Sequence, residues 1–204
     1  MTAPLIVVSP TTEPVTVWEA KQHLREENNY QNEEFFSMAI RAAREYFEWR
    51  TGRALYQQTL KYVLYQWPCE NWVELPRATP LQSISSVVYR DSTGASTTWD
   101  SGDYVPDTDA IPGRLVLGYG ESWPSFTPYP VSPISITYVA GQLEESPPVI
   151  FPATVSICIL ELVAGIWENR ESEIISQGPQ QLTTISTRYG VESKIAMYMA
   201  GHVF

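Results

Sequence analysis

The sequence predicts an α+β fold: a small helical bundle core with a β-strand-rich insertion and an extended C-terminal arm. Helical periodicity is found before residue 52 and again after residue 151. Between them lie segments rich in β-branched and aromatic residues, bounded by Pro, Asn and Gly, which is typical of strands and turns. After residue 171 the chain is polar. Because helices pack on helices and strands on strands, this order favours a β insertion in a helical domain.

The length of 204 residues suggests one domain, or one domain with an elaboration. We expect an extended leader over residues 1–15, a main domain over 16–171 and a C-terminal arm over 172–204. The main domain is expected to contain helices at about 17–25, 32–51 and 152–170, and the β insertion at about 55–141.

The first two helices have recognisable ends. Thr16 and Glu19 match a capping box, in which a hydroxyl and a carboxylate bind the free backbone amides of a helix start. The second helix begins near Asn32, carries acidic residues in its first turn, where the helix dipole favours them, and ends at Gly52.

The second helix is apolar over an unusually wide arc. At 100° per residue, charged residues including Arg44 and Glu48 form one polar arc. The opposite side is widened well past the usual stripe of about 100° by four residues: Phe35, Met38, Ala42 and Trp49. Either the helix lies between two elements of its own domain, or this flank meets another subunit. The third helix is apolar nearly all round, which predicts a central, buried helix.

The β insertion contains several predicted strands and one long loop. The strands are expected within residues 59–67, 83–90, 96–99, 114–117 and 134–141, with a turn at Asp91–Gly94. The loop from Gly118 to Pro133 holds four prolines and four aromatic residues. Its length exceeds the usual connection, which indicates a functional or partner-facing segment. Near the C-terminus, residues 183–190 are compatible with a strand and residues 191–199 with a short helix.

The charge balance excludes one class of function. Thirteen Lys and Arg against 23 Asp and Glu give a net charge of −10, and no basic run occurs. A protein that holds nucleic acid needs clustered cations to neutralise phosphates, so such binding is not expected. The most apolar stretch, Val149 to Trp167, contains Pro152 and Glu161 and fits a core helix better than a membrane span. We therefore expect no membrane association.

No catalytic, cofactor or metal site is expected. The two histidines, His23 and His202, lack neighbours at ligand spacing, and the glycines at 118 and 120 match neither a nucleophile elbow nor a dinucleotide loop. Cys69 and Cys158 lie far apart in the sequence, so a disulfide framework is not expected. The aspartates between residues 100 and 109 are interpreted as turn residues.

Four tryptophans in the β segment have two interpretations. They either form half-buried packing or an interface, which is the commoner role, or provide a platform for a sugar. The residues are Trp67, Trp72, Trp99 and Trp123.

The order of several segments resembles the head–tail connector (adaptor, or head-completion) proteins of long-tailed bacteriophages. The resemblance begins with VTVWEAKQHLR at residues 15–25 and continues through TGRAL and ELPRATPLQSISSVVYRDSTG. It then includes SWP, ISITYVAG and PATVSICILELVAGIWENRES, and the tail is a looser match. No single segment is specific for this family, whereas the ordered series of segments over residues 15–171 is much more specific.

The resemblance implies a structural protein without catalysis or cofactor. Proteins of this family form a ring, commonly dodecameric, beneath the portal in the virion. The ring extends the DNA channel, through which DNA passes without sequence-specific binding, and tail or tail-terminator (stopper) proteins dock on its other face. The expected partners are therefore copies of the chain, the portal and a tail protein. The expected location is the head–tail junction, after assembly in the host cytoplasm.

Two groups of residues become site hypotheses on this basis. Phe35, Met38, Ala42 and Trp49 are expected at the subunit interface of the ring. A portal or partner docking arm is expected to use apolar residues without an obvious internal partner: Tyr189, Ile195, Met197, Tyr198, Met199 and Phe204. Arg53 and residues 167–170, which lie at helix ends, fit ordinary packing as well as an interface. A tail-completion protein one level lower and a carbohydrate-binding β module remain alternatives.

Overall fold

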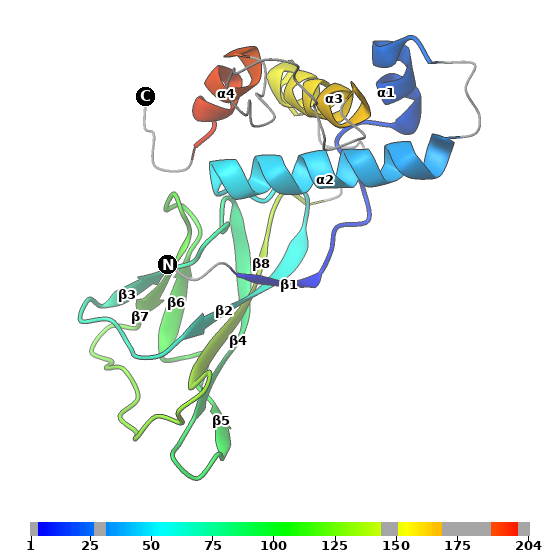
Figure 1. Ribbon diagram of the computed structural model, residues 1–204. Coiled ribbons are helices and arrows are strands. Elements are labelled where there is room, and N and C mark those ends of the chain that lie inside the picture. The colour runs from blue at the N-terminus through cyan, green and yellow to red at the C-terminus, as the bar shows by residue number, and fades with distance from the viewer. Residues whose placement is uncertain (1–3, 27–31, 144–150, 169–188, 200–204) are drawn as a thin grey trace, which may run out of the picture. The chain divides into compact units, whose positions relative to one another are not determined.

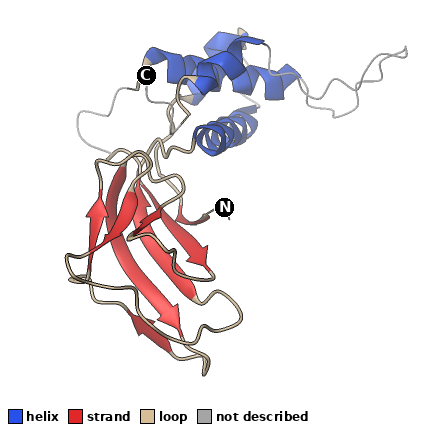
Figure 2. Cartoon of the chain, turned by 90° about the vertical axis from the view of Figure 1, so that its left-hand side faces the viewer, coloured by secondary structure: helices blue, strands red, loops and turns tan. Residues whose placement is uncertain are grey.

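The structure is a computed structural model that describes residues 4–26, 32–143, 151–168 and 189–199. The chain divides into two compact units. The β unit contains the described parts of Met1–Thr12 and Gly52–Val149, and the helical unit those of Glu13–Thr51 and Ile150–His202. Figure 2 shows that one unit contributes the strands and the other the helices. The predicted α+β class is confirmed.

The helical unit is built around one long helix. In Figure 1 the helices α1 (Val17–Leu24), α3 (Ala153–Glu168) and α4 (Tyr189–Ala196) lie along one side of α2 (Glu33–Thr51). The buried side chains include Phe36 and Phe47 of α2, Ile159 of α3 and Ile195 of α4. Each such side chain stabilises the unit by about 1.5–3 kcal/mol relative to exposure.

The helix ends follow the sequence signals. The hydroxyl of Thr16 accepts a hydrogen bond from the amide of Glu19 at 3.2 Å, and the Glu19 carboxylate accepts one from the Thr16 amide at 2.7 Å. The predicted capping box is therefore confirmed. Helix α2 ends before Gly52, whose φ of 67° is in the left-handed region that favours glycine at such a position.

The β unit consists of two antiparallel sheets in the part of the chain that is described. The larger has the order β1-β2-β8-β4-β5 and the smaller β3-β7-β6. The larger sheet contains β1 (Leu5–Val8), β2 (Gln58–Leu64), β8 (Ile134–Ala140), β4 (Leu81–Arg90) and β5 (Ser96–Thr98). The smaller contains β3 (Trp72–Glu74), β7 (Arg114–Leu117) and β6 (Tyr104–Asp107).

One hydrophobic core draws on both sheets. Alternate residues of β8 from Ile134 to Ala140 are buried, as the two-residue period of a strand requires. The core includes Leu60 and Ile136 from the larger sheet and Leu115 from the smaller. The hydroxyl of the buried Tyr138 donates a hydrogen bond to the carbonyl oxygen of Pro76.

The structure differs from the sequence predictions in three strands and one helix. Strands β1, β3 and β6, which have 3 or 4 residues each, were not predicted, and β6 contains Pro106. The leader is therefore extended but also pairs with β2. The prediction that α3 is a central, buried helix holds for only part of its surface: Val155, Cys158, Ile159 and Val163 are buried, but Ile157 is 44% exposed. Residues 183–188 of the possible strand lie outside the described residues, and Tyr189 and Gly190 begin α4.

Gly141, at the end of β8, provides a test of this packing. Its φ is 100°, and a Cβ there would overlap the backbone carbonyl of Tyr56. We expect Gly141→Ala to destabilise the β unit by more than the roughly 1–3 kcal/mol of backbone strain alone. Gly120→Ala is the matched control, because Gly120 also has a positive φ, of 83°, but a methyl group added there would have no atom within 4 Å. Urea unfolding of both variants measures the difference, and equal losses would contradict the steric explanation.

Candidate functional site

Three of the four predicted interface residues form an exposed stripe on α2. Met38 is 61% and Trp49 60% exposed, and Ala42 is exposed as well. Their spacings of four and seven residues place them on one side of the helix. We call Met38, Ala42 and Trp49 the α2 flank. Phe35 is different: it is half-buried, and its ring meets that of Trp167 edge-on at 5.5 Å. It therefore belongs to the packing between α2 and α3.

The indole of Trp49 is supported by its neighbours. The guanidinium of Arg50 lies 5.9 Å from the centre of the ring, and the ring of Tyr46 lies 6.1 Å away. Arg50 is in turn bound to Glu192 of α4 at 2.7 Å. A large apolar ring that is held in place and yet exposed is well suited to contact with a partner.

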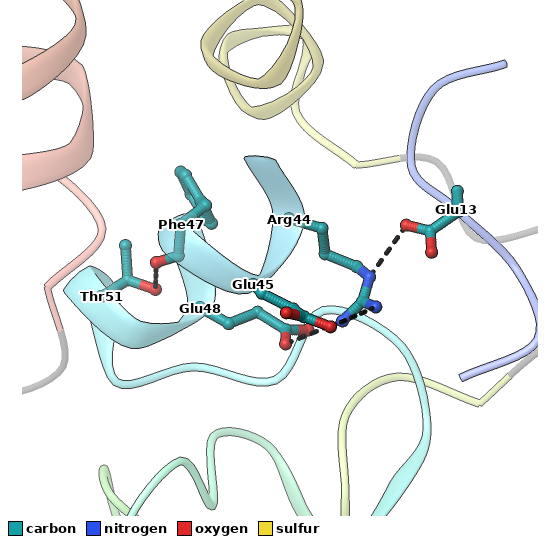
Figure 3. Close-up of polar contacts among 6 residues, drawn as sticks. All are labelled: Glu13, Arg44, Glu45, Phe47, Glu48 and Thr51. Carbon is teal, nitrogen blue, oxygen red and sulfur yellow. Dashed lines mark hydrogen bonds and ion pairs between the residues drawn. The ribbon is translucent and has the colours of Figure 1, made fainter. Parts of the chain in front are cut away.

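The polar arc of α2 is not entirely on the surface. Arg44 and Glu48 were expected there, but their side chains are 1% and 0% exposed. Figure 3 shows the guanidinium of Arg44 between Glu48, Glu45 and Glu13, which precedes α1. Its distances to the carboxylates of Glu13 and Glu48 are 2.8 Å and 3.1 Å. Residues one turn apart on a helix pair readily, but the contribution of Glu13 is tertiary and has no signal in the sequence.

The charge of Arg44 is secured by these carboxylates. Burial lowers the pKa of the guanidinium. The hydrogen bond to Glu13 and the charges of Glu48, Glu13 and Glu45 outweigh burial, so the pKa is raised. Arg44 is thus a structural cation that ties the segment before α1 to α2.

The residues of the expected docking arm are divided by the structure. Ile195 is buried, and the ring of Tyr198 lies 6.0 Å from that of Phe47. The expectation that these two lack an internal partner is wrong. Met197 and Met199 are exposed. Tyr189 is the first residue of α4, and Phe204 lies outside the described residues.

Helix α4 makes polar contacts with both α2 and α3. Glu192 accepts hydrogen bonds from the hydroxyl of Tyr46 at 3.0 Å and from Arg50 at 2.7 Å. Lys194 pairs with Glu161 of α3 at 2.6 Å. Together with the burial of Val191 and Ile195, these contacts make α4 a member of the helical unit. Of the arm side chains that the structure describes, those of Met197 and Met199 are the exposed large apolar ones.

The tryptophans of the β unit mostly pack on one another. Trp67 and Trp123 stack at 4.7 Å, and the buried Trp99 lies 5.6 Å from each. Trp72 lies beneath the guanidinium of Arg114 at 4.3 Å. This arrangement supports the packing interpretation, because stacking uses ring faces that a sugar platform would present to its ligand.

The long loop after β7 is attached to the β unit by its aromatic residues. Trp123 donates a hydrogen bond from Nε1 to the carbonyl of Glu70 at 2.9 Å. The ring of Phe126 lies 4.9 Å from that of Tyr89, and Arg90 lies over Tyr129 at 4.5 Å. Tyr119 remains fully exposed. The loop is therefore an ordered surface with one projecting tyrosine.

The aspartates of the β unit act in turns. Asp91 accepts hydrogen bonds from the hydroxyl and amide of Thr93, which lower the pKa of its carboxyl group. Asp100 accepts from the amide of Gly102, and Asp103 from the indole of Trp99. Among the described residues no group of three His, Cys, Asp or Glu side chains is arranged to hold a metal.

The two thiols differ in exposure. Cys158 is buried, and burial raises its pKa to about 11. Cys69 is exposed, and the two thiols are free. No helix in the described part of the chain has the length and apolar character needed to cross a membrane.

Solved structures with the same fold include chains of gene transfer agent (GTA) particles. A chain from the virion of a native GTA particle is 20% identical with a TM-score of 0.71, over 100% of this chain and 98% of that chain. One from the neck of an empty GTA particle, computed with C6 symmetry, is 21% identical with a TM-score of 0.70 over the same shares. One from the neck of a native GTA particle, computed with C12 symmetry, is 18% identical with a TM-score of 0.65, over 98% and 97%. No protein-family model and no curated protein matches the sequence.

The buried cation predicts a large effect of a single truncation. Arg44→Ala removes the positive charge beside the fully buried Glu48 and should destabilise the helical unit by about 3–5 kcal/mol. Arg50→Ala breaks a pair whose side chains are more than one-third exposed and should cost about 1 kcal/mol or less. Urea unfolding followed by circular dichroism distinguishes the two. Similar losses in both variants would contradict the structural role assigned to Arg44.

Proposed function

We propose that this chain is a structural virion protein that forms a ring between portal and tail, extends the DNA channel and provides the tail docking surface. The observation that carries this proposal is the similarity of fold, over nearly the full length of both chains, to chains of GTA particles. The ordered sequence resemblance to head–tail connector proteins supports the same role. The proposed partners are other copies of the chain, the portal and a tail protein, at the head–tail junction.

The physical properties of the chain suit this role. A ring is a head-to-tail assembly, so each subunit needs two different faces, and the α2 flank is proposed as one of them. The two neck structures were computed with C6 and C12 symmetry, which is compatible with a dodecamer for this chain. With a net charge of −10, a channel wall that carries carboxylates would repel DNA phosphates and let DNA slide without being held.

The second candidate within the virion is a tail-completion protein, which lies one level below the ring. A composition without a catalytic set of residues fits it equally well. Both candidates are structural and non-enzymatic. A carbohydrate-binding module is less well supported, because the tryptophans on which it depended pack on one another.

The α2 flank gives a direct test of ring formation. The double variant Met38→Lys, Trp49→Lys places charges in the proposed interface and should abolish rings, while the exposure of both side chains leaves the monomer folded. Mass photometry measures assembly, alone or on added portal, and circular dichroism checks the fold. The control Ser37→Lys introduces one lysine on an exposed position outside the flank and should assemble normally. Rings that persist in the double variant would exclude this face.

The exposed methionines after α4 give a test of portal docking. Deletion of residues 189–204 would also remove the buried Ile195, so substitution is the cleaner change. Met197→Ser with Met199→Ser should weaken binding to the portal protein at least tenfold without altering the free protein. Ala196→Ser is the matched exposed control and should bind as wild type. Cosedimentation with purified portal measures both, and unchanged binding of the methionine variant would refute the docking role.

A further inference from the structure

The N-terminal strand β1 faces water on both sides although every residue in it is apolar. Its sequence is Leu-Ile-Val-Val, and its side chains are between 38% and 62% exposed. None of them belongs to the hydrophobic core cluster of the β unit. The side chains of β1 are therefore not part of this core cluster. The strand is joined to the larger sheet by its backbone pairing with β2.

The two edges of the larger sheet differ in a way that argues for a partner at β1. At the opposite edge, β5 has the polar sequence Ser-Thr-Thr, which suits an edge exposed to water. Residues 1–12, which include β1, contain no charged side chain. Edge strands that face water usually carry charges or proline, which discourage pairing with other chains. The wholly apolar composition of β1 instead fits a strand whose side chains are covered by another protein chain.

The pairing of β1 with β2 is short. It includes Leu5 opposite Lys61, Ile6 opposite Leu60 and Val8 opposite Thr59, with a shift of register between Ile6 and Val8. The backbone of β2 offers the same hydrogen bonds to the β1 strand of any copy of the chain. Exchange of an identical element between subunits keeps every contact of that element and adds new ones, so assembly by this route has a low free-energy cost.

The chain that follows β1 is anchored in its own subunit. Glu13, five residues after Val8, binds the buried Arg44 at 2.8 Å. Pro10 and Pro14 stiffen the segment around it. The leader thus has one end fixed to the helical unit by an ion pair, and nearer its other end it pairs with β2 over a short strand.

We propose that β1 is exchanged between neighbouring subunits of the ring, so that β1 of one copy completes the sheet of the next copy at β2. This inference rests on the proposed ring. Each subunit then donates one strand and accepts one, which is a head-to-tail relation that closes around a ring. At the subunit boundary the apolar side chains of β1 are covered by the donor and the acceptor together. The free monomer keeps β1 on its own β2, as described above.

A disulfide between β1 and β2 tests the exchange. In a Cys69→Ser background, Leu5→Cys is combined with Lys61→Cys, because these residues lie directly opposite each other. Opposite residues of antiparallel strands have Cα atoms about 4.5–5.5 Å apart, within the range of a disulfide. Oxidised rings of this double variant should give covalent oligomers on non-reducing gels. Mixed rings of the two single variants should give covalent dimers, and dilute monomer only an internal disulfide.

The outcomes separate the exchange from the proposed function. Intact rings with only internal disulfides, or with no disulfide, would overturn the exchange and leave the ring proposal standing. Leu5→Cys with Thr97→Cys is the control and should not cross-link; cross-linking there would show β1 paired with β5 of a neighbour and would also overturn it. If the first pair prevents assembly, Val8→Cys with Thr59→Cys replaces it. Failure of the wild-type chain to form rings, alone or with portal, would instead overturn the proposed function.

Discussion

The ion pairs of Arg44 are the constraint on which the helical unit depends. A buried guanidinium is tolerated only when carboxylates neutralise it, and here Glu48 comes from the same helix while Glu13 comes from the segment before α1. The cluster therefore fixes where the chain enters the helical unit and which side of α2 is withdrawn from water. Helices α1, α3 and α4 pack on other parts of the surface of α2. The α2 flank is still exposed.

The chain also exposes a large number of apolar side chains. They occur in both units: Met38 and Trp49 on α2, Ile157 on α3, and all of β1. These residues are spread over elements of different kinds, and a monomer gains nothing from exposing them. The proposed ring subunit, with two lateral neighbours and partners on two further faces, needs several such surfaces.

The sequence predicts correctly those features whose signal is local. The capping box of Thr16 and Glu19, the end of α2 at Gly52 and the turn at Asp91 depend on residues within four positions of one another. The longer strands β2, β4 and β8 were found because this part of the chain is rich in β-branched and aromatic residues bounded by Pro, Asn and Gly. Strands β1, β3 and β6 were missed, although β5 and β7 are just as short and were predicted. Whether so short a segment is a strand depends on its partner strand, which no local pattern specifies.

By itself, the sequence determined the α+β class and the position of the main helices. These follow from periodicity and composition, which each segment carries alone. The tertiary structure decided what is buried. It placed Arg44 and Glu48 inside, because Glu13 is brought to them from another part of the chain. It also gave Ile195 and Tyr198 internal partners and left Ile157 exposed. Burial depends on neighbours that are distant in the sequence, and no local pattern specifies them.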